Sequence, residues 1–171
     1  MQNALRITGG ALIAALSLSG AALAQTSNNR VDAKSDWSVF VETTPSKICW
    51  VTSAPEKTVN SKKGVNRGEI QLLVTYKPGA AEGEVSFTGG YPFKPDSTIK
   101  MQIGSDVFTL YPDGEWAWPA TAADDSRIRA AMMAGADALL TGESSRGTVT
   151  KDTFSLIGFT DALKTAEQNC S

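Results

Sequence analysis

Short runs in which apolar and polar residues alternate recur along the chain at intervals of roughly ten residues. In "WSVFVET", Trp37, Val39 and Val41 fall on one side of an extended backbone, and in "KICWVTSA", Cys49 and Val51 share a side. Successive side chains of a strand point to opposite faces, so each run can bury one face. Such runs, separated by glycine and proline turns, predict a mainly β protein, a single-domain antiparallel β-sandwich.

The same signals predict further strands in "EIQLLVTYKPG", "GEVSFTGG", "STIKMQIGSDVFTLYPDG", "EWAWP", "ADALLTGES" and "GTVTKDTFSLIG". The third of these runs contains Gly104-Ser105. Glycine at the first central position suits a type II′ turn, so this run is expected to form a two-stranded hairpin. The glycine-, asparagine- and lysine-rich stretch that ends at Gly68 is expected to be a loop.

Two short helices are predicted, at about 120–134 and 159–170. Thr121 followed by Asp124 resembles a capping box, and helical spacing continues to a stop at Gly135. The apolar stripe of the last helix consists of Phe159, Leu163, Ala166 and Cys170. Because this stripe must dock on the sheet, the Cys170 sulfur is expected to point into the protein.

The first 24 residues have the composition of a secretory signal peptide. Arg6 precedes a long uncharged run, and Ala22 and Ala24 occupy the positions that a signal peptidase reads before a cut at Ala24/Gln25. An uncleaved anchor fits less well, because the run is shorter than the roughly 20 apolar residues of a membrane span. Cleavage leaves 171 − 24 = 147 residues, enough for one domain.

We therefore expect a periplasmic or envelope-associated protein that does not span the membrane after cleavage. A flexible leader is expected over residues 25–36, and one β domain over residues 37–171. Without Arg6 the chain has 15 basic and 18 acidic residues, a net charge of −3, which gives no electrostatic basis for binding nucleic acid. The local basic excess is interpreted as a solvated loop, with a patch for an acidic partner as the alternative; it comprises Lys57, Lys62, Lys63 and Arg67.

No catalytic residue is assigned. The chain has no histidine, which removes Ser-His-Asp and Cys-His catalysis and most zinc sites, and it has no glycine-rich nucleotide motif, so neither a metal nor a cofactor is expected. The acidic pairs Asp113/Glu115 and Asp124/Asp125 are interpreted as a turn and a helix start, although glycoside hydrolysis needs only two carboxyl groups. A Ser-Lys pair from Ser144, Ser145 and Lys151 is a generic arrangement.

Four aromatic residues form the candidate binding surface. Tyr91 and Phe93 lie beside two glycines in "GGYPFK", and Trp116 and Trp118 share one face of the short run "EWAWP". Exposed rings of this kind stack on sugars or anchor a partner, whereas buried rings belong to the core. The alternation favours burial of the tryptophan pair and leaves Tyr91 and Phe93 open between the two environments.

The chain has two cysteines, Cys49 and Cys170, separated by 170 − 49 = 121 residues. In an oxidising compartment they can form one disulfide, which would stabilise the fold by about 4–5 kcal/mol in the chain-entropy model. A reactive pair would need a nearby cation or a CxxC partner, and neither is visible. Two free thiols are the remaining alternative, and we predict the disulfide.

Five blocks carry a family resemblance: "CWVTSAP", "GEIQLLVTYKPG", "GEVSFTGGYPFK", "DGEWAWPA" and "SSRGTVTKDTFSLIGFTDALKTAEQNC". In this order behind a signal peptide, they resemble the invasion-associated locus B family of exported alphaproteobacterial proteins, from about Trp37 to Cys170. The resemblance implies an exported, β-rich envelope protein, named for host-cell invasion by pathogenic members. It carries over the pair Cys49 and Cys170 and supplies no active site.

The sequence thus predicts a non-enzymatic module that binds an envelope protein, a host protein or a cell-wall component. The alternative is a carbohydrate- or peptidoglycan-binding or -hydrolysing protein, with Asp113 and Glu115 acting beside exposed Trp116 and Trp118.

Overall fold

The computed structural model describes residues 29–78 and 82–170, so the predicted signal peptide lies outside the described residues. The strands are β1 Arg30–Lys34, β2 Trp37–Glu42, β3 Ile48–Ser53, β4 Lys57–Asn60, β5 Gln71–Tyr76, β6 Glu84–Thr88, β7 Ile99–Ile103, β8 Asp106–Asp113, β9 Trp116–Trp118, β10 Asp137–Glu143 and β11 Val149–Ser155. The helices are α1 Ala122–Ala134 and α2 Phe159–Cys170. The predicted class, mainly β with two short helices, is confirmed.

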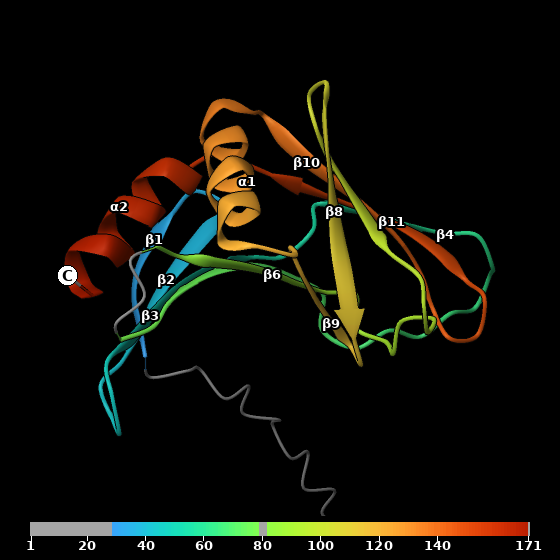
Figure 1. Ribbon diagram of the computed structural model, residues 1–171, viewed down its shortest axis with the longest axis horizontal. Helices are drawn as coiled ribbons and strands as arrows, with labels where there is room; N and C mark the ends of the chain where they lie inside the picture. The colour runs from blue at the N-terminus through green and yellow to red at the C-terminus, as the bar shows by residue number, and fades with distance from the viewer. Residues whose placement is uncertain (1–28, 79–81, 171) are drawn as a thin grey trace, which may run out of the picture.

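In the described part of the chain the strands form one antiparallel sheet with the order β1-β2-β3-β5-β6-β9-β8-β7-β10-β11-β4. Strand β8 pairs with β7 through residues 106–110 and with β9 through residues 111–113. It therefore joins a first half, β1-β2-β3-β5-β6-β9, to a second half, β7-β10-β11-β4 (Figure 1).

The inner faces of the two halves share one hydrophobic core. Phe87 of β6 and Phe154 of β11 are not on neighbouring strands, yet their rings meet edge to face with centroids 6.1 Å apart. Trp37 of β2 donates a hydrogen bond of 3.0 Å from Nε1 to the carbonyl oxygen of Ser155 at the end of β11. The sheet is thus folded over on itself like a sandwich, which agrees with the predicted architecture.

The two helices pack where the second half does not cover the first (Figure 1). Helix α2 lies against β2 and β3, and its Phe159 ring is 4.7 Å from the Trp37 ring. The predicted disulfide is present: the Cys49 and Cys170 sulfurs are 2.04 Å apart, which ties the last turn of α2 to β3. Neither cysteine is free, so a reactive thiol has no place in this structure.

The predicted local signals at α1 and at the β7–β8 hairpin are confirmed. Thr121 Oγ1 accepts a hydrogen bond of 3.2 Å from the Asp124 amide, and the Gly135 amide donates to Ala131 at 2.8 Å. Gly104 has φ +56° between the paired residues Ile103 and Asp106, as a two-residue turn with glycine first requires.

Two strands were not predicted from the sequence. Residues 30–34 form β1, although residues 25–36 were expected to be a flexible leader; residues 25–28 lie outside the described part. Strand β4 lies inside the predicted loop. Both strands lie at the sheet edges, are held by backbone pairing and expose Val31 and Val59, so they lack the alternation that marks a half-buried strand.

Candidate binding surface

The four predicted surface aromatics occupy two different environments. Tyr91 and Phe93 are only 9% and 5% exposed, so their assignment to a binding surface is wrong. Their rings lie 5.0 Å apart, and Phe93 also packs 5.9 Å from Phe87. A Cβ at Gly89 would lie 2.9 Å from the Tyr91 ring. The neighbouring glycine therefore allows close inward packing of this loop, and does not mark an exposed turn.

Tyr91 also belongs to a buried polar network. Arg67 donates two hydrogen bonds, of 2.7 and 2.6 Å, to the Asp152 carboxylate, and its guanidinium lies 5.0 Å from the Tyr91 ring centroid. The Tyr91 and Thr150 hydroxyls are 2.6 Å apart, and burial raises the Tyr91 pKa. The Arg67 and Asp152 side chains are 6% and 0% exposed, so Arg67 does not belong to a solvated basic loop as predicted. The network fastens the β4–β5 segment to β11.

Trp116 and Trp118 lie on the outer face of β9, away from the core. Ala117 between them is fully buried, while both tryptophans are half-buried, with ring centroids 6.5 Å apart. The predicted burial of this pair is therefore wrong. The reason is the cross-strand partner: Phe87 stands directly opposite Ala117 and fills the core, which leaves room for a small side chain only.

The aromatic character of this outer face continues across the first half. Phe40 of β2 and Trp50 of β3 are half-buried outer neighbours whose rings stack at 5.2 Å with planes 5° apart. Tyr111 of β8, 52% exposed, stands directly opposite Trp118. We call this surface the outer aromatic face; it consists of Phe40, Trp50, Leu73, Tyr111, Trp116 and Trp118.

The outer aromatic face is broad and carries hydrogen-bonding groups. Strands β2 and β8 are five strand spacings apart in the sheet order, which at ~4.8 Å each corresponds to roughly 24 Å. Outward positions between the rings carry the half-buried Ser38, Thr52, Gln71 and Thr75 and the buried Ser86 and Thr88. Thr52 Oγ1 is buried without a hydrogen-bond partner within the described residues. The half-buried Ser38, Gln71 and Thr75 therefore add polar contacts to the stacking surface.

Only one of the two carboxyl groups predicted beside the tryptophans lies there. Asp113 stands opposite Trp116 on β8. Glu115 instead borders a hollow of about 420 Å³ whose lining includes Ser145 and Arg146 but neither Asp113 nor a tryptophan. Glycoside hydrolysis requires two carboxyl groups that flank the bound sugar, and Asp113 and Glu115 are not arranged in this way.

The other catalytic alternatives are engaged in structural contacts. Ser144 is buried, and its Oγ accepts a hydrogen bond of 3.1 Å from the Thr148 amide, while Lys151 is exposed on the outer side of β11. Asp124 caps α1 through Thr121, and Asp125 accepts a hydrogen bond of 2.7 Å from the Val85 amide. Burial raises the Asp125 pKa.

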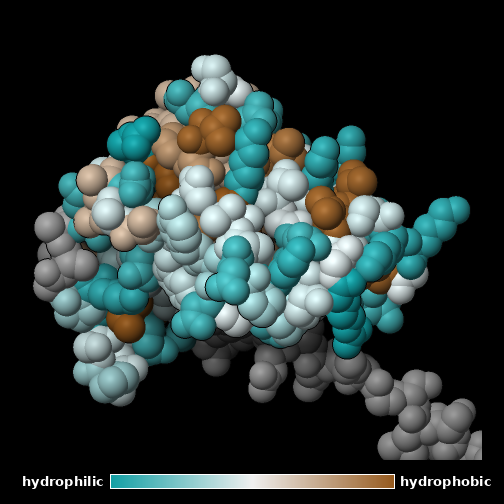
Figure 2. Space-filling view, turned by 45° about the vertical axis from the view of Figure 1, so that its right-hand side comes forward, coloured by the Kyte–Doolittle hydropathy of each residue, from teal (hydrophilic) through white to brown (hydrophobic). Residues whose placement is uncertain are grey.

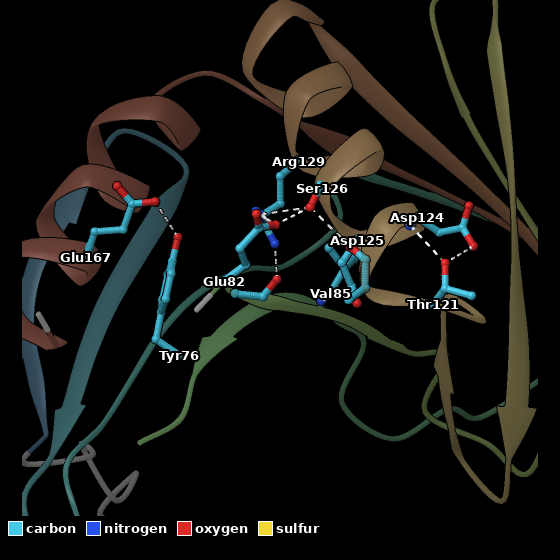
Figure 3. A network of polar contacts seen from close by, with 11 residues as sticks. Tyr76, Glu82, Val85, Thr121, Asp124, Asp125, Ser126, Arg129 and Glu167 are labelled. Carbon is cyan, nitrogen blue, oxygen red and sulfur yellow. Dashed lines mark hydrogen bonds and ion pairs between the residues drawn. The ribbon is translucent and has the colours of Figure 1, made fainter. Parts of the chain in front are cut away.

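A polar network around Asp125 fixes the two helices to the first half (Figure 3). Arg129 of α1 is buried and contacts both the Gly83 carbonyl oxygen and the Glu82 carboxylate, and Ser126 donates to Glu82. These partners lower the pKa of Glu82. On the other side, Tyr76 of β5 donates a 2.7 Å hydrogen bond to Glu167 of α2. Since these groups engage one another, the network is interpreted as structural.

Comparison of the chain with protein-family models, with curated proteins and with solved structures found no match. None of the helices in residues 29–78 and 82–170 has both the length and the apolar composition needed to cross a membrane. The same residues contain no group of three or more acidic or cysteine side chains placed to hold a metal ion. The outer aromatic face remains the candidate binding surface.

Proposed function

We propose that the chain is an exported envelope protein of the invasion-associated locus B type that acts as a non-enzymatic binding module through its outer aromatic face. One observation carries the proposal: Trp50, Trp116 and Trp118 lie on the solvent side of the sheet, whereas Trp37 is fully buried. Large rings gathered on an outer face are typical of surfaces that recognise a partner, where tryptophan and tyrosine contribute most of the binding energy.

The shape of the face fits an extended partner. The rings lie on four of the six strands from β2 to β8, so contacts would be distributed over a wide area. A partner that makes these contacts must be extended, as an envelope protein, a host protein or a cell-wall polymer is. Host-cell invasion would apply where the source is a pathogen, as the resemblance implies.

Carbohydrate binding is a second candidate function, favoured by the mixture of rings and hydroxyl groups. Pyranose rings stack on tryptophan, and the half-buried Thr75 lies between the Phe40/Trp50 and Trp116/Trp118 pairs, where its hydroxyl would bond a sugar hydroxyl. Glu115 borders a hollow that Asp113 and the tryptophans do not line, which favours binding of a glycan over its hydrolysis.

The test compares binding of three proteins to isolated peptidoglycan and to solubilised envelope proteins. In Trp116→Ala/Trp118→Ala both rings of β9 are lost, and in the control Met133→Ala/Ile157→Ala two apolar side chains exposed elsewhere are lost. We expect the tryptophan variant to bind at least tenfold more weakly and the control to bind normally. Weaker binding of the tryptophan variant to peptidoglycan would identify a glycan ligand. Weaker binding to the envelope proteins would identify a protein partner. If the tryptophan variant bound as well as the control variant, the proposal would be wrong.

The export step has its own test, because the signal peptide lies outside the described residues. The intact mass of the protein recovered from the periplasm is expected to correspond to a chain that begins at Gln25. A mass that retains the first 24 residues would contradict cleavage.

A further inference from the structure

The outer face of the second half carries exposed lysines in a regular arrangement. Lys100 of β7 and Lys151 of β11 stand on either side of Thr141 in one cross-strand row, and Lys57 of β4 stands opposite Thr153 in the next row. The adjacent residues Met101 and Asp152 are buried, so the lysines point outward. We call this surface the lysine face; it consists of Lys57, Lys100 and Lys151 with their outer neighbours on β4, β7, β10 and β11.

The positive charge of the lysine face is not balanced from within the protein. Within residues 29–78 and 82–170, none of its three lysines forms an ion pair. Glu143 on the same face is already paired with Lys94 at 3.1 Å, and Asp137 lies at the far end of β10. Since the whole chain carries a net charge of −2, this local excess reflects a separation of charge over the surface.

Further cations adjoin the lysine face at the β4 edge. Lys62 Nζ donates a hydrogen bond of 2.8 Å to the Arg146 carbonyl oxygen, which brings the segment after β4 against the β10–β11 hairpin. Lys62, Lys63 and Arg146 are all exposed there. The positive surface therefore extends beyond the three central lysines.

Exposed apolar side chains border the lysines. Val59 stands opposite Lys151 and is 48% exposed, and Val107 of β8 stands opposite Gln102 and is 52% exposed. Figure 2, in which the right-hand side of Figure 1 comes forward, shows hydrophilic side chains standing out beside small hydrophobic patches. A surface that combines cations with small apolar groups suits an interface that has both charge and an apolar layer.

We propose that the lysine face docks the protein on an anionic lipid bilayer. Lys100 and Lys151 are two strand spacings apart, roughly 10 Å, on a sheet surface, so they do not converge on one small anion. Phosphate headgroups in a plane are complementary to such a spread of positive charge, and each lysine near the surface adds to the attraction. The valines contact the layer beneath the headgroups.

Docking through this face has a consequence for the rest of the molecule. The inner faces of the two halves meet in the core, so their outer faces point away from each other. A protein that rests on a bilayer with the lysine face holds the outer aromatic face away from the lipid. The proposal is independent of the ligand of the aromatic face.

The test is flotation with lipid vesicles of a chain that begins at Gln25, which keeps every described element. Mixed phosphatidylglycerol and phosphatidylcholine vesicles are compared with pure phosphatidylcholine vesicles. The variant Lys57→Gln/Lys100→Gln/Lys151→Gln is expected to partition about a hundredfold less onto the anionic vesicles. The control Lys47→Gln/Lys77→Gln/Lys164→Gln removes the same charge elsewhere, so it is expected to bind as the unmodified protein does.

Binding to anionic vesicles alone, weakened by salt and lost only in the first variant, would support the proposal. Absence of binding to anionic vesicles, or equal binding by the two variants, would overturn it. Release of the protein by soluble polyphosphate at the same phosphate concentration would also overturn it, in favour of a soluble polyanion. Lys100→Gln alone, expected to bind about fivefold more weakly, provides a readout if the triple variant fails to fold.

Discussion

The two halves of the sheet have similar inner faces and different outer faces. Inside, both contribute to one core, through residues such as Phe87 and Phe154. Outside, the first half presents rings such as Trp50 and Trp118, and the second half presents lysines and threonines. Since burial constrains only the inner positions, the outer positions are free to carry two separate binding surfaces on one sheet.

The largest expected effect concerns the link between α2 and the first half. Cys49→Ser/Cys170→Ser, or reduction of the disulfide, opens a loop of 121 residues and should lower the free energy of unfolding by about 4–5 kcal/mol. The measurement is equilibrium denaturation with and without reductant. Identical curves would show that the disulfide does not stabilise the fold.

Inner and outer aromatic residues should respond differently to truncation. Phe87→Ala leaves a cavity in the shared core and should cost about 3–5 kcal/mol of stability. Trp118→Ala removes a half-buried ring from the outer face, so it should cost no more than about 1 kcal/mol while weakening partner binding. Urea denaturation of the two variants provides the comparison, and a larger loss for Trp118→Ala would reverse the assignment of faces.

The inner face of the second half contributes Asp152 to the most buried ion pair among the described residues. Asp152→Ala leaves the Arg67 guanidinium buried without its carboxylate and should cost about 3–5 kcal/mol. Asp106→Ala, at an exposed position of β8, serves as the control and should change stability by less than about 0.5 kcal/mol. Thermal denaturation of both variants would reveal whether the pair stabilises the fold; equal melting temperatures would contradict this.

The smallest expected effect is a dependence on pH. Ser126 and Arg129 lower the pKa of Glu82 below its ordinary value of 4.5. Because the folded-state pKa is the lower one, this contact stabilises the protein above pH 4.5, and the contribution is lost as the pH falls through the folded-state pKa. Acid titration of stability should show a shallower decline in Glu82→Gln than in the unmodified protein. Superimposable titrations would exclude the contribution.

The inner side of the sheet could be predicted from the sequence because burial leaves a period-two pattern. Val39 and Val51 carry that signal, while the two helices were predicted from other signals, the cap at Thr121 and the helically spaced stripe that ends at Cys170. The disulfide followed from the facing of Cys49 and Cys170 and from the expected oxidising compartment. Edge strands β1 and β4 could not be predicted, since backbone pairing with one neighbour holds them and leaves no apolar pattern.

The candidate site was predicted only in part, because alternation shows that two side chains share a face and does not say which face is buried. For Trp116 and Trp118 the answer depends on Phe87, which is remote in sequence and stands opposite Ala117. For Tyr91, burial depends on the contact with Arg67, which is again distant in the sequence. The alternation of Trp50 with buried Cys49 and Val51 was a usable signal for the aromatic face.

The central claim is that a partner covers the outer aromatic face, and acrylamide quenching of tryptophan fluorescence tests it most directly. Trp37 is inaccessible in the core, so quenching of the free protein reports on Trp50, Trp116 and Trp118. Addition of the envelope fraction that binds the protein should reduce the quenching strongly. Binding of that fraction with unchanged quenching would show that the partner contacts another surface.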